Sequence, residues 1–183
     1  MFENGHEFEL VTRINGLAPY HVHTSVYRFT ASNRAVYLVN VERYRLNTYA
    51  LKFYPRQHKK HPKKYNLCIN TSTSTGVSKI LRTVLDIALS IRNEDQFASF
   101  AFIGAFKISD NKRKEAETTE ETQRYRIYKG MVEHLFGSET FRHIYQSRTN
   151  SYLLVSKSSE QPDDLDNRII DMFVEIYPDV SSL

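Results

Sequence analysis

One stretch of the sequence has an apolar spacing that fits only a helix, and it constrains the fold more than any other feature. In residues 76–93 apolar side chains recur at steps of three and four, and Leu85 and Leu89 widen the stripe to more than half the circumference. Such a helix has to be covered on most sides. We therefore predict a central core helix, which the Ser/Thr run at 71–75 can cap. Its narrow polar strip carries Lys79, Arg82, Asp86, Ser90 and Asn93.

Most other apolar residues alternate with polar ones or form short runs, as strands do. Regular alternation places Phe8 and Arg13 on opposite faces of the first strand, and His21 and His23 on one face of the second. Two further helical patterns occur, at 120–136 and 164–176. The strands are predicted at 6–14, 22–30, 34–43, 49–53, 65–69, 98–106, 141–146 and 152–155.

These elements predict the fold class. At 183 residues the chain fits a single α+β domain spanning 1–183, which buries about 70% of its unfolded surface. We expect a mainly antiparallel sheet of about six to eight strands, packed against two or three helices on one face. Residues 109–119 are charged and have no periodicity, so they are predicted to form a mobile loop.

Positive charge is concentrated in one short segment. The net charge is only +4, but residues 56–64 read RQHKKHPKK, and the chain after Glu160 is acidic. If this segment contacts the phosphates of a nucleic acid, Tyr54 and Tyr65 beside it are candidate base-stacking platforms. The alternative is a solvated turn, in which lysine and proline prevent edge pairing. The candidate phosphate contacts are Arg56, Lys59, Lys60, Lys63 and Lys64.

A second basic feature lies at the start of the predicted helix 120–136. Arg124 falls along the apolar stripe of this helix rather than away from it, and Arg126 follows two residues later. One interpretation is a structural arginine that is paired with a carboxylate or with carbonyl groups. The other is an anion site, because a guanidinium and the amides of a helix N-terminus favour the same ligand.

Several classes of site are excluded or unsupported. The single cysteine, Cys68, allows no disulfide and no cysteine zinc site within one chain. No glycine-rich phosphate loop occurs, and no histidine stands at a recognised spacing from a nucleophile. Catalytic residues are therefore unknown, and we expect neither a cofactor nor a metal. Without a targeting segment or an apolar run of about 18 residues, we expect a cytoplasmic protein with no membrane contact.

Four short motifs carry a family resemblance over residues 65–128. The chain is similar to small uncharacterised bacterial families, common in Bacteroidetes, that have a Y-N-L strand, an L-x-T-V helix, an apolar strand ending near glycine and an R-x-R-L-Y helix. The Asp-rich stretch of those families is a Ser/Thr run here. The resemblance implies an α+β domain with no established activity, and it marks Arg124 and Arg126 for testing. The motifs here are Tyr65-Asn66-Leu67, Lys79-Ile80-Leu81-Arg82-Thr83-Val84, Ile103-Gly104-Ala105 and Arg124-Tyr125-Arg126-Ile127-Tyr128.

Two functions follow as hypotheses. The first is a non-catalytic accessory or interaction protein with a protein partner, of a bacterial defence or toxin-antitoxin locus, because no catalytic motif is present. The second is a basic protein that binds nucleic acid or cleaves RNA without metal. The two hypotheses differ in whether the basic segment, Arg124, Arg126 and a histidine converge on one concave surface.

Overall fold

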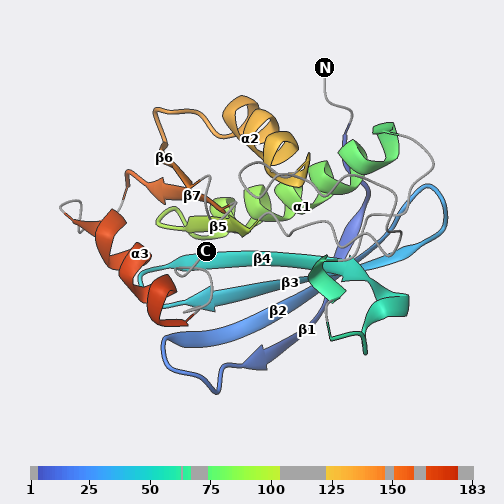
Figure 1. The fold of residues 1–183 in the computed structure, drawn as a ribbon, viewed down its shortest axis with the longest axis horizontal. Helices are drawn as coiled ribbons and strands as arrows, with labels where there is room; N and C mark the ends of the chain where they lie inside the picture. Colours follow the sequence, from blue (N-terminus) through green and yellow to red (C-terminus); the bar gives the residue numbers. More distant parts are fainter. Residues whose placement is uncertain are drawn as a thin grey trace, which may run out of the picture.

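The computed structural model describes residues 4–62, 64–66, 74–103, 123–146, 151–158 and 164–176. These residues form a seven-stranded sheet and three α-helices, which confirms the predicted α+β class (Figure 1). The helices are α1 (Ser74–Glu94), α2 (Gln123–Leu135) and α3 (Leu165–Ile176). The strands are β1 (Phe8–Asn15), β2 (His21–Thr30), β3 (Val36–Tyr44), β4 (Thr48–Pro55), β5 (Ser99–Ile103), β6 (Phe141–Gln146) and β7 (Ser151–Ser156).

The sheet is mainly antiparallel, as predicted. Its strand order is β1-β2-β3-β4-β5-β7-β6, so β1 to β4 form a meander of sequential neighbours. Strands β4 and β5 are parallel, and α1 lies in the connection between them. The remaining pairs, β5 with β7 and β7 with β6, are antiparallel. The crossover through α1 thus joins the four-stranded antiparallel part, β1 to β4, to a smaller part that consists of β5, β7 and β6.

Helix α1 forms the centre of the larger core, which confirms the periodicity argument. Its apolar stripe packs on one face of β3, β4 and β5, and α2 lies beside it, as Figure 1 shows. Met131, Val132 and Phe136 extend this core from α2 and the residue after it. The apolar side chains of α1 that are fully buried are Ile80, Leu81, Val84, Leu85, Ile87 and Ala88.

The polar strip of α1 is partly covered by the start of the chain. The backbone N–H of Gly5 donates to Asp86 Oδ2 over 3.2 Å, and that of His6 donates to Thr83 Oγ1 over 2.8 Å. A side chain at Gly5 would bring its Cβ within 2.4 Å of Asp86 Oδ2 and 2.9 Å of the Thr83 Cα. Glycine is therefore required for this close approach.

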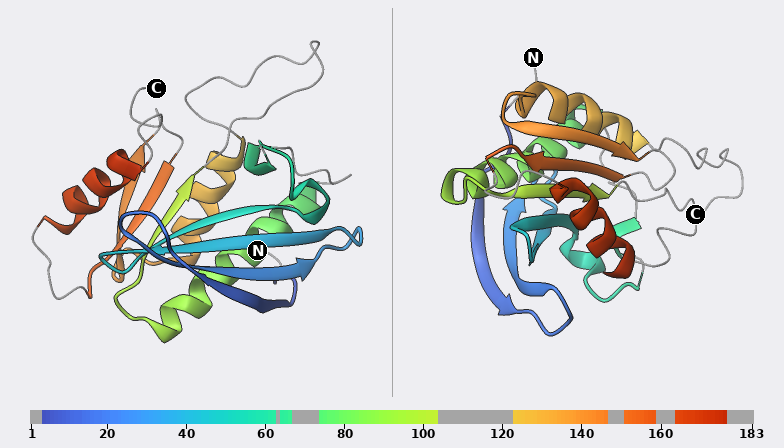
Figure 2. Two further views of the ribbon diagram at one scale, coloured as in Figure 1. Left: turned by 90° about the horizontal axis from the view of Figure 1, so that it is seen from below. Right: turned by 90° about the vertical axis from the view of Figure 1, so that its left-hand side faces the viewer.

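Helix α3 packs on the opposite face of the sheet, so the prediction that all helices lie on one face is wrong (Figure 2). Its buried residues Leu165, Ile169 and Met172 contact a second core cluster. The reason is that neighbouring strand residues point to opposite faces, and β4, β5 and β7 are apolar at consecutive positions. The strand side chains of this second cluster are Tyr44, Ala50, Ala101, Leu153 and Val155.

The predicted strand 65–69 is not a strand where the structure describes it. Lys64–Asn66 is a 3-10 turn, and residues 67–69 lie outside the described ranges. The Tyr65 ring packs edge-on against Tyr54 at 5.3 Å, and the Tyr65 hydroxyl accepts a hydrogen bond from Asn40. These contacts hold Tyr65 against the sheet without making it a strand. The predicted loop at 109–119 also lies outside the described ranges.

Candidate anion-binding site

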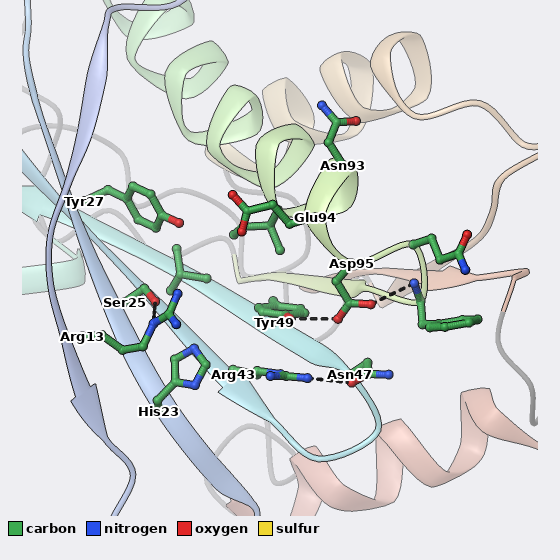
Figure 3. Close-up of a pocket in the computed structure, with 14 residues that line it drawn as sticks. Arg13, His23, Ser25, Tyr27, Arg43, Asn47, Tyr49, Asn93, Glu94 and Asp95 are labelled. Carbon is green, nitrogen blue, oxygen red and sulfur yellow. Dashed lines mark hydrogen bonds between the residues drawn. The ribbon is translucent and has the colours of Figure 1, made fainter.

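A polar cleft lies where α1 ends and no longer covers the sheet. The cleft has a volume of about 690 Å³. Strands β1 to β4 form one wall, and the end of α1 with the loop before β5 forms the other (Figure 3). The strand face that is apolar beneath α1 therefore becomes polar beyond it. The lining residues are Arg13, His23, Ser25, Tyr27, Val41, Arg43, Asn47, Tyr49, Ile91, Asn93, Glu94, Asp95, Gln96 and Phe97.

A β-bulge in β1 places Arg13 in this cleft. Leu10 pairs with Tyr27 and Thr12 pairs with Val26, so Val11 is an extra residue without a partner in β2. One extra residue reverses the facing of everything beyond it. Arg13 consequently lies on the same face as Leu10 and Tyr27. The prediction that Phe8 and Arg13 face opposite sides is wrong for this reason.

A second irregularity, in β2, separates the two histidines of that strand. His21 pairs with Tyr44 and His23 with Arg43, so the register shifts at Val22. Because Tyr44 and Arg43 are consecutive, they point to opposite faces. His23 therefore faces the cleft and His21 faces the α3 side, where its ring lies 5.4 Å from the Tyr44 ring. The prediction of one shared face is wrong.

Three strands then contribute one row of side chains to the floor of the cleft. His23 lies opposite Arg43, and Arg43 lies opposite Tyr49. Residues directly opposite each other in an antiparallel pair have Cβ atoms about 5 Å apart. Arg13 reaches the next row, opposite Ser25. The floor thus brings two guanidinium groups to either side of one imidazole, as Figure 3 shows.

Among the described residues, the side-chain hydrogen-bond partners of the two arginines are neutral. Arg43 Nη2 donates to Asn47 Oδ1 over 3.0 Å, and Arg13 Nε donates to Ser25 Oγ over 3.2 Å. Arg43 also stacks near the Tyr49 ring, with its Cζ 5.7 Å from the centroid. Its Nε is buried and makes no hydrogen bond. Within the described ranges neither arginine forms an ion pair, although four other ion pairs occur there.

His23 is held in its neutral form by this environment. Burial lowers the pKa of His23, and the positive charges of Arg13, Arg43 and His21 lower it further. A neutral imidazole at physiological pH can accept a proton, and it carries one N–H and one lone pair. An anion bound between the arginines would reverse the charge effect and favour protonation.

The acidic residues across the cleft differ in their roles. The Tyr49 hydroxyl donates to Asp95 Oδ2 over 2.9 Å, and the Phe97 N–H donates to Asp95 Oδ1 over 3.0 Å. Burial raises the pKa of Tyr49, and the hydrogen bond to Asp95 raises it further, so Tyr49 keeps its proton. Asp95 is thus a structural residue that fixes the loop after α1. Glu94 beside it is exposed and forms no ion pair or hydrogen bond in the described part of the chain.

The basic segment predicted to contact phosphate lies elsewhere. It follows Pro55, which pairs with Tyr37, whereas the cleft lies at the Arg43–Tyr49 end of the same hairpin. Six residues of strand separate the two ends by about 20 Å. Arg56, Lys59 and Lys60 are exposed there, Lys64 is partly buried, and Lys63 lies outside the described ranges.

The aromatic neighbours of that segment already have partners. Tyr54 is only 3% exposed, and the Lys64 Nζ lies 4.4 Å from the centre of its ring. The same ammonium group lies 5.1 Å from the centre of the Tyr65 ring. A buried ring cannot stack on a base, so the interpretation of Tyr54 as a stacking platform is wrong. Lys64 is held by cation–π contacts instead.

Arg124 and Arg126 lie in the first turns of α2. Their side chains fall outside the described part of the structure, so the anion site predicted for them stays a prediction. Among the described residues no group of three or more His, Cys, Asp or Glu could hold a metal ion. No described helix is long and apolar enough to cross a membrane.

No protein-family model, curated protein or solved structure matches this chain. The resemblance to small bacterial families therefore stays a prediction as well.

The cleft residues were not predicted, but the sequence holds one signal for them. On β3, Val39 and Val41 occupy the core-facing positions, and Arg43 continues the same alternation. A charged residue on the buried side of a central strand needs a partner or a function. Arg13 has no comparable signal, because a bulge that alternation does not reveal determines where it faces. His23 continues the alternation of Tyr27 and Ser25, and the register shift changes the facing of His21 instead.

Proposed function

We propose that this protein binds a phosphate-bearing ligand in the cleft, held by Arg13, His23 and Arg43. The observation that carries the proposal is the state of Arg43. Its guanidinium is partly buried, its Nε is buried without a partner, and it forms no ion pair with the described residues. A buried charge costs free energy unless an opposite charge compensates it. A bound anion supplies that compensation.

The geometry favours phosphate over a simple carboxylate. Arg13, His23 and Arg43 come from three strands, so their N–H groups line one cleft at separate places. A carboxylate uses one planar fork, whereas the oxygens of a phosphate accept hydrogen bonds in several directions. His23 can in addition exchange a proton with the ligand.

This proposal is closest to the alternative of nucleic-acid binding, but it uses different residues. The basic segment lies at the far end of the hairpin, so it does not form part of this cleft. Metal-independent RNA cleavage stays a prediction, in which His23 is the residue placed to move a proton. Arg13 and Arg43 would then stabilise the charge on phosphorus oxygens.

The test is calorimetric titration of the purified chain with inorganic phosphate. Arg43→Gln should weaken binding by roughly 10- to 100-fold, which corresponds to the loss of a charge-assisted hydrogen bond of about 1.5 to 3 kcal/mol. Arg45→Gln is the matched control, since Arg45 is exposed outside the cleft and carries the same charge. Equal effects of the two substitutions, or no phosphate binding by the wild type, would overturn the proposal.

The accessory or interaction role in a defence or toxin-antitoxin locus is the second candidate. One observation favours it: five of the seven large hydrophobic side chains exposed among the described residues lie on β1, on β2 or between them. This second candidate function also assumes that the protein is cytoplasmic. Neighbouring genes and co-purification with a protein partner would test it. The five residues are Leu10, Val11, Ile14, Leu17 and Val22.

A further inference from the structure

The second wall of the cleft carries acidic and amide groups, whereas the first wall is basic. It consists of the end of α1 and the loop that follows, with Asn93, Glu94, Gln96 and Phe97 lining it. Figure 3 shows Asn93 and Glu94 on the helix side, across from the row of Arg13, His23 and Arg43. Because the Asp95 carboxylate is already bonded to Tyr49 and to the Phe97 N–H, Glu94 is the acidic acceptor this wall offers to a ligand.

A ligand that fills this cleft has to satisfy both walls. A bare phosphate would use only the strand side and would be repelled by Glu94. A cleft of about 690 Å³ lies in the size range of sites for small organic molecules, roughly 300 to 1,000 Å³. The matching ligand is therefore anionic at one end and carries hydrogen-bond donors at the other.

We infer that the ligand is a nucleotide, with its phosphate on the arginine wall and its base against the end of α1. This inference rests on the proposed function and narrows it. Phe97 is partly buried and makes no ring contact with the other described aromatic residues, so it is available for stacking on a base. Glu94 accepts donors from the edge of the base, and Asn93 and Gln96 add amide groups.

The same chemistry favours guanine among the bases. A guanine edge presents two adjacent N–H donors, which match the two oxygens of a carboxylate in a bidentate pair. Adenine, cytosine and uracil present no such pair of donors on that edge. The carboxylate lies across the cleft from the arginines, so the charges of the two walls fix the direction in which the nucleotide lies.

The experiment compares guanosine 5′-monophosphate, adenosine 5′-monophosphate and ribose 5-phosphate in calorimetric titrations of the full chain. Guanosine monophosphate should bind roughly tenfold or more tightly than ribose 5-phosphate, which is the discrimination expected of one bidentate pair. Glu94→Gln should abolish this preference and leave the affinity for ribose 5-phosphate unchanged or slightly higher. Glu139→Gln, an exposed site that is not in the cleft lining, should keep the preference.

The outcomes distinguish a failure of the nucleotide inference from a failure of the proposed phosphate site. Equal binding of all three compounds, or an unchanged preference in Glu94→Gln, overturns the nucleotide inference and leaves the phosphate site standing. A preference for adenosine monophosphate that depends on Glu94 supports a nucleotide and overturns the choice of guanine. If none of the compounds binds, the proposed function fails together with the inference.

Discussion

Arg43 shows how a single side chain can mark a site. It sits in the register of a core strand, between Val41 and the turn at Asn47, yet among the described residues it contacts an amide oxygen and an aromatic ring and forms no ion pair. Burial lowers the pKa of the neighbouring His23, and the positive charges of Arg13, Arg43 and His21 lower it further. Stability alone would favour an apolar residue at this position. The proposed phosphate ligand would compensate this charge.

The residue-scale prediction concerns His23 and pH. Burial and the adjacent arginines lower the pKa of His23 in the empty cleft. A bound sulfate should raise that pKa, so His23 should take up a proton when sulfate binds. The sulfate affinity should therefore increase as pH falls through the range in which His23 titrates, by at most about tenfold per pH unit. Sulfate is chosen because its own charge is constant there, and calorimetry at several pH values measures the effect.

Substitutions of the two histidines of β2 supply the test and its control. His23→Gln should remove the pH dependence, whereas His21→Gln should keep most of it, because His21 faces the α3 side. The other charged groups around His23 are Arg13 and Arg43, with Glu94 and Asp95 across the cleft. An affinity that falls on acidification would contradict the assignment of His23 to the anion.

At the scale of elements, irregularities in two strands build the cleft. The extra residue Val11 places Arg13 on the inner face, and the register shift at Val22 separates His23 from His21. Bulges are common next to functional sites because they redirect side chains. The apolar face of the sheet stops where α1 ends. Arg13, which the bulge turns to this face, therefore lies in the open cleft instead of the core.

Deletion of Val11 tests the bulge directly. Since Val11 has no partner in β2, removing it should restore regular pairing and leave Arg13 on the inner face. Sulfate affinity should then stay within about threefold of the wild type, as expected when only an unpaired residue is lost. Deletion of Glu9, in the regular part of β1, should instead turn Phe8 away from the core and lower the melting temperature. Folded protein without sulfate binding after deletion of Val11 would refute the bulge assignment.

We predict that stability depends most on helix α1, which lies at the centre of the larger core. Leu81 is 0% exposed at its centre, whereas Lys79 lies on the polar strip. Leu81→Ala should lower the free energy of unfolding by about 2 to 5 kcal/mol through the cavity it leaves. Lys79→Ala should change it by no more than about 0.5 kcal/mol. Urea denaturation measures both, and similar losses would mean that the buried face has been misassigned.

Periodicity was sufficient for most elements and insufficient for the site. The stripe of α1, the alternation of β3 and the hairpin of β6 and β7 depend on local spacing, which the sequence displays directly. The facing of Arg13 and of His21 depends on one extra residue in each strand, and regular alternation does not show where such a residue lies. Tyr65 was misassigned for a different reason, because its tertiary contacts with Tyr54 and Asn40 override a short β-like pattern.

At the scale of the whole molecule, the two faces of the sheet have different tasks. Helices α1 and α2 cover one face and leave the cleft open at its end, while α3 covers part of the other face, over β4, β5 and β7 (Figure 2). Positive charge is present at both ends of the β3–β4 hairpin, in the cleft and in the segment after Pro55. A polyanion that contacts the exposed segment and a small phosphate ligand that enters the cleft would therefore bind at distinct places.

The most direct test of the anion-binding cleft is an NMR titration of the arginine Nε–H resonances with inorganic phosphate. Arg43 and Arg13 should show large, saturable shifts, because the buried Nε of Arg43 gains charge nearby and Arg13 gains a partner. Arg45, outside the cleft, should not shift. Shifts confined to Arg56 and its lysine neighbours, with Arg13 and Arg43 unchanged at saturation, would contradict phosphate binding in the cleft.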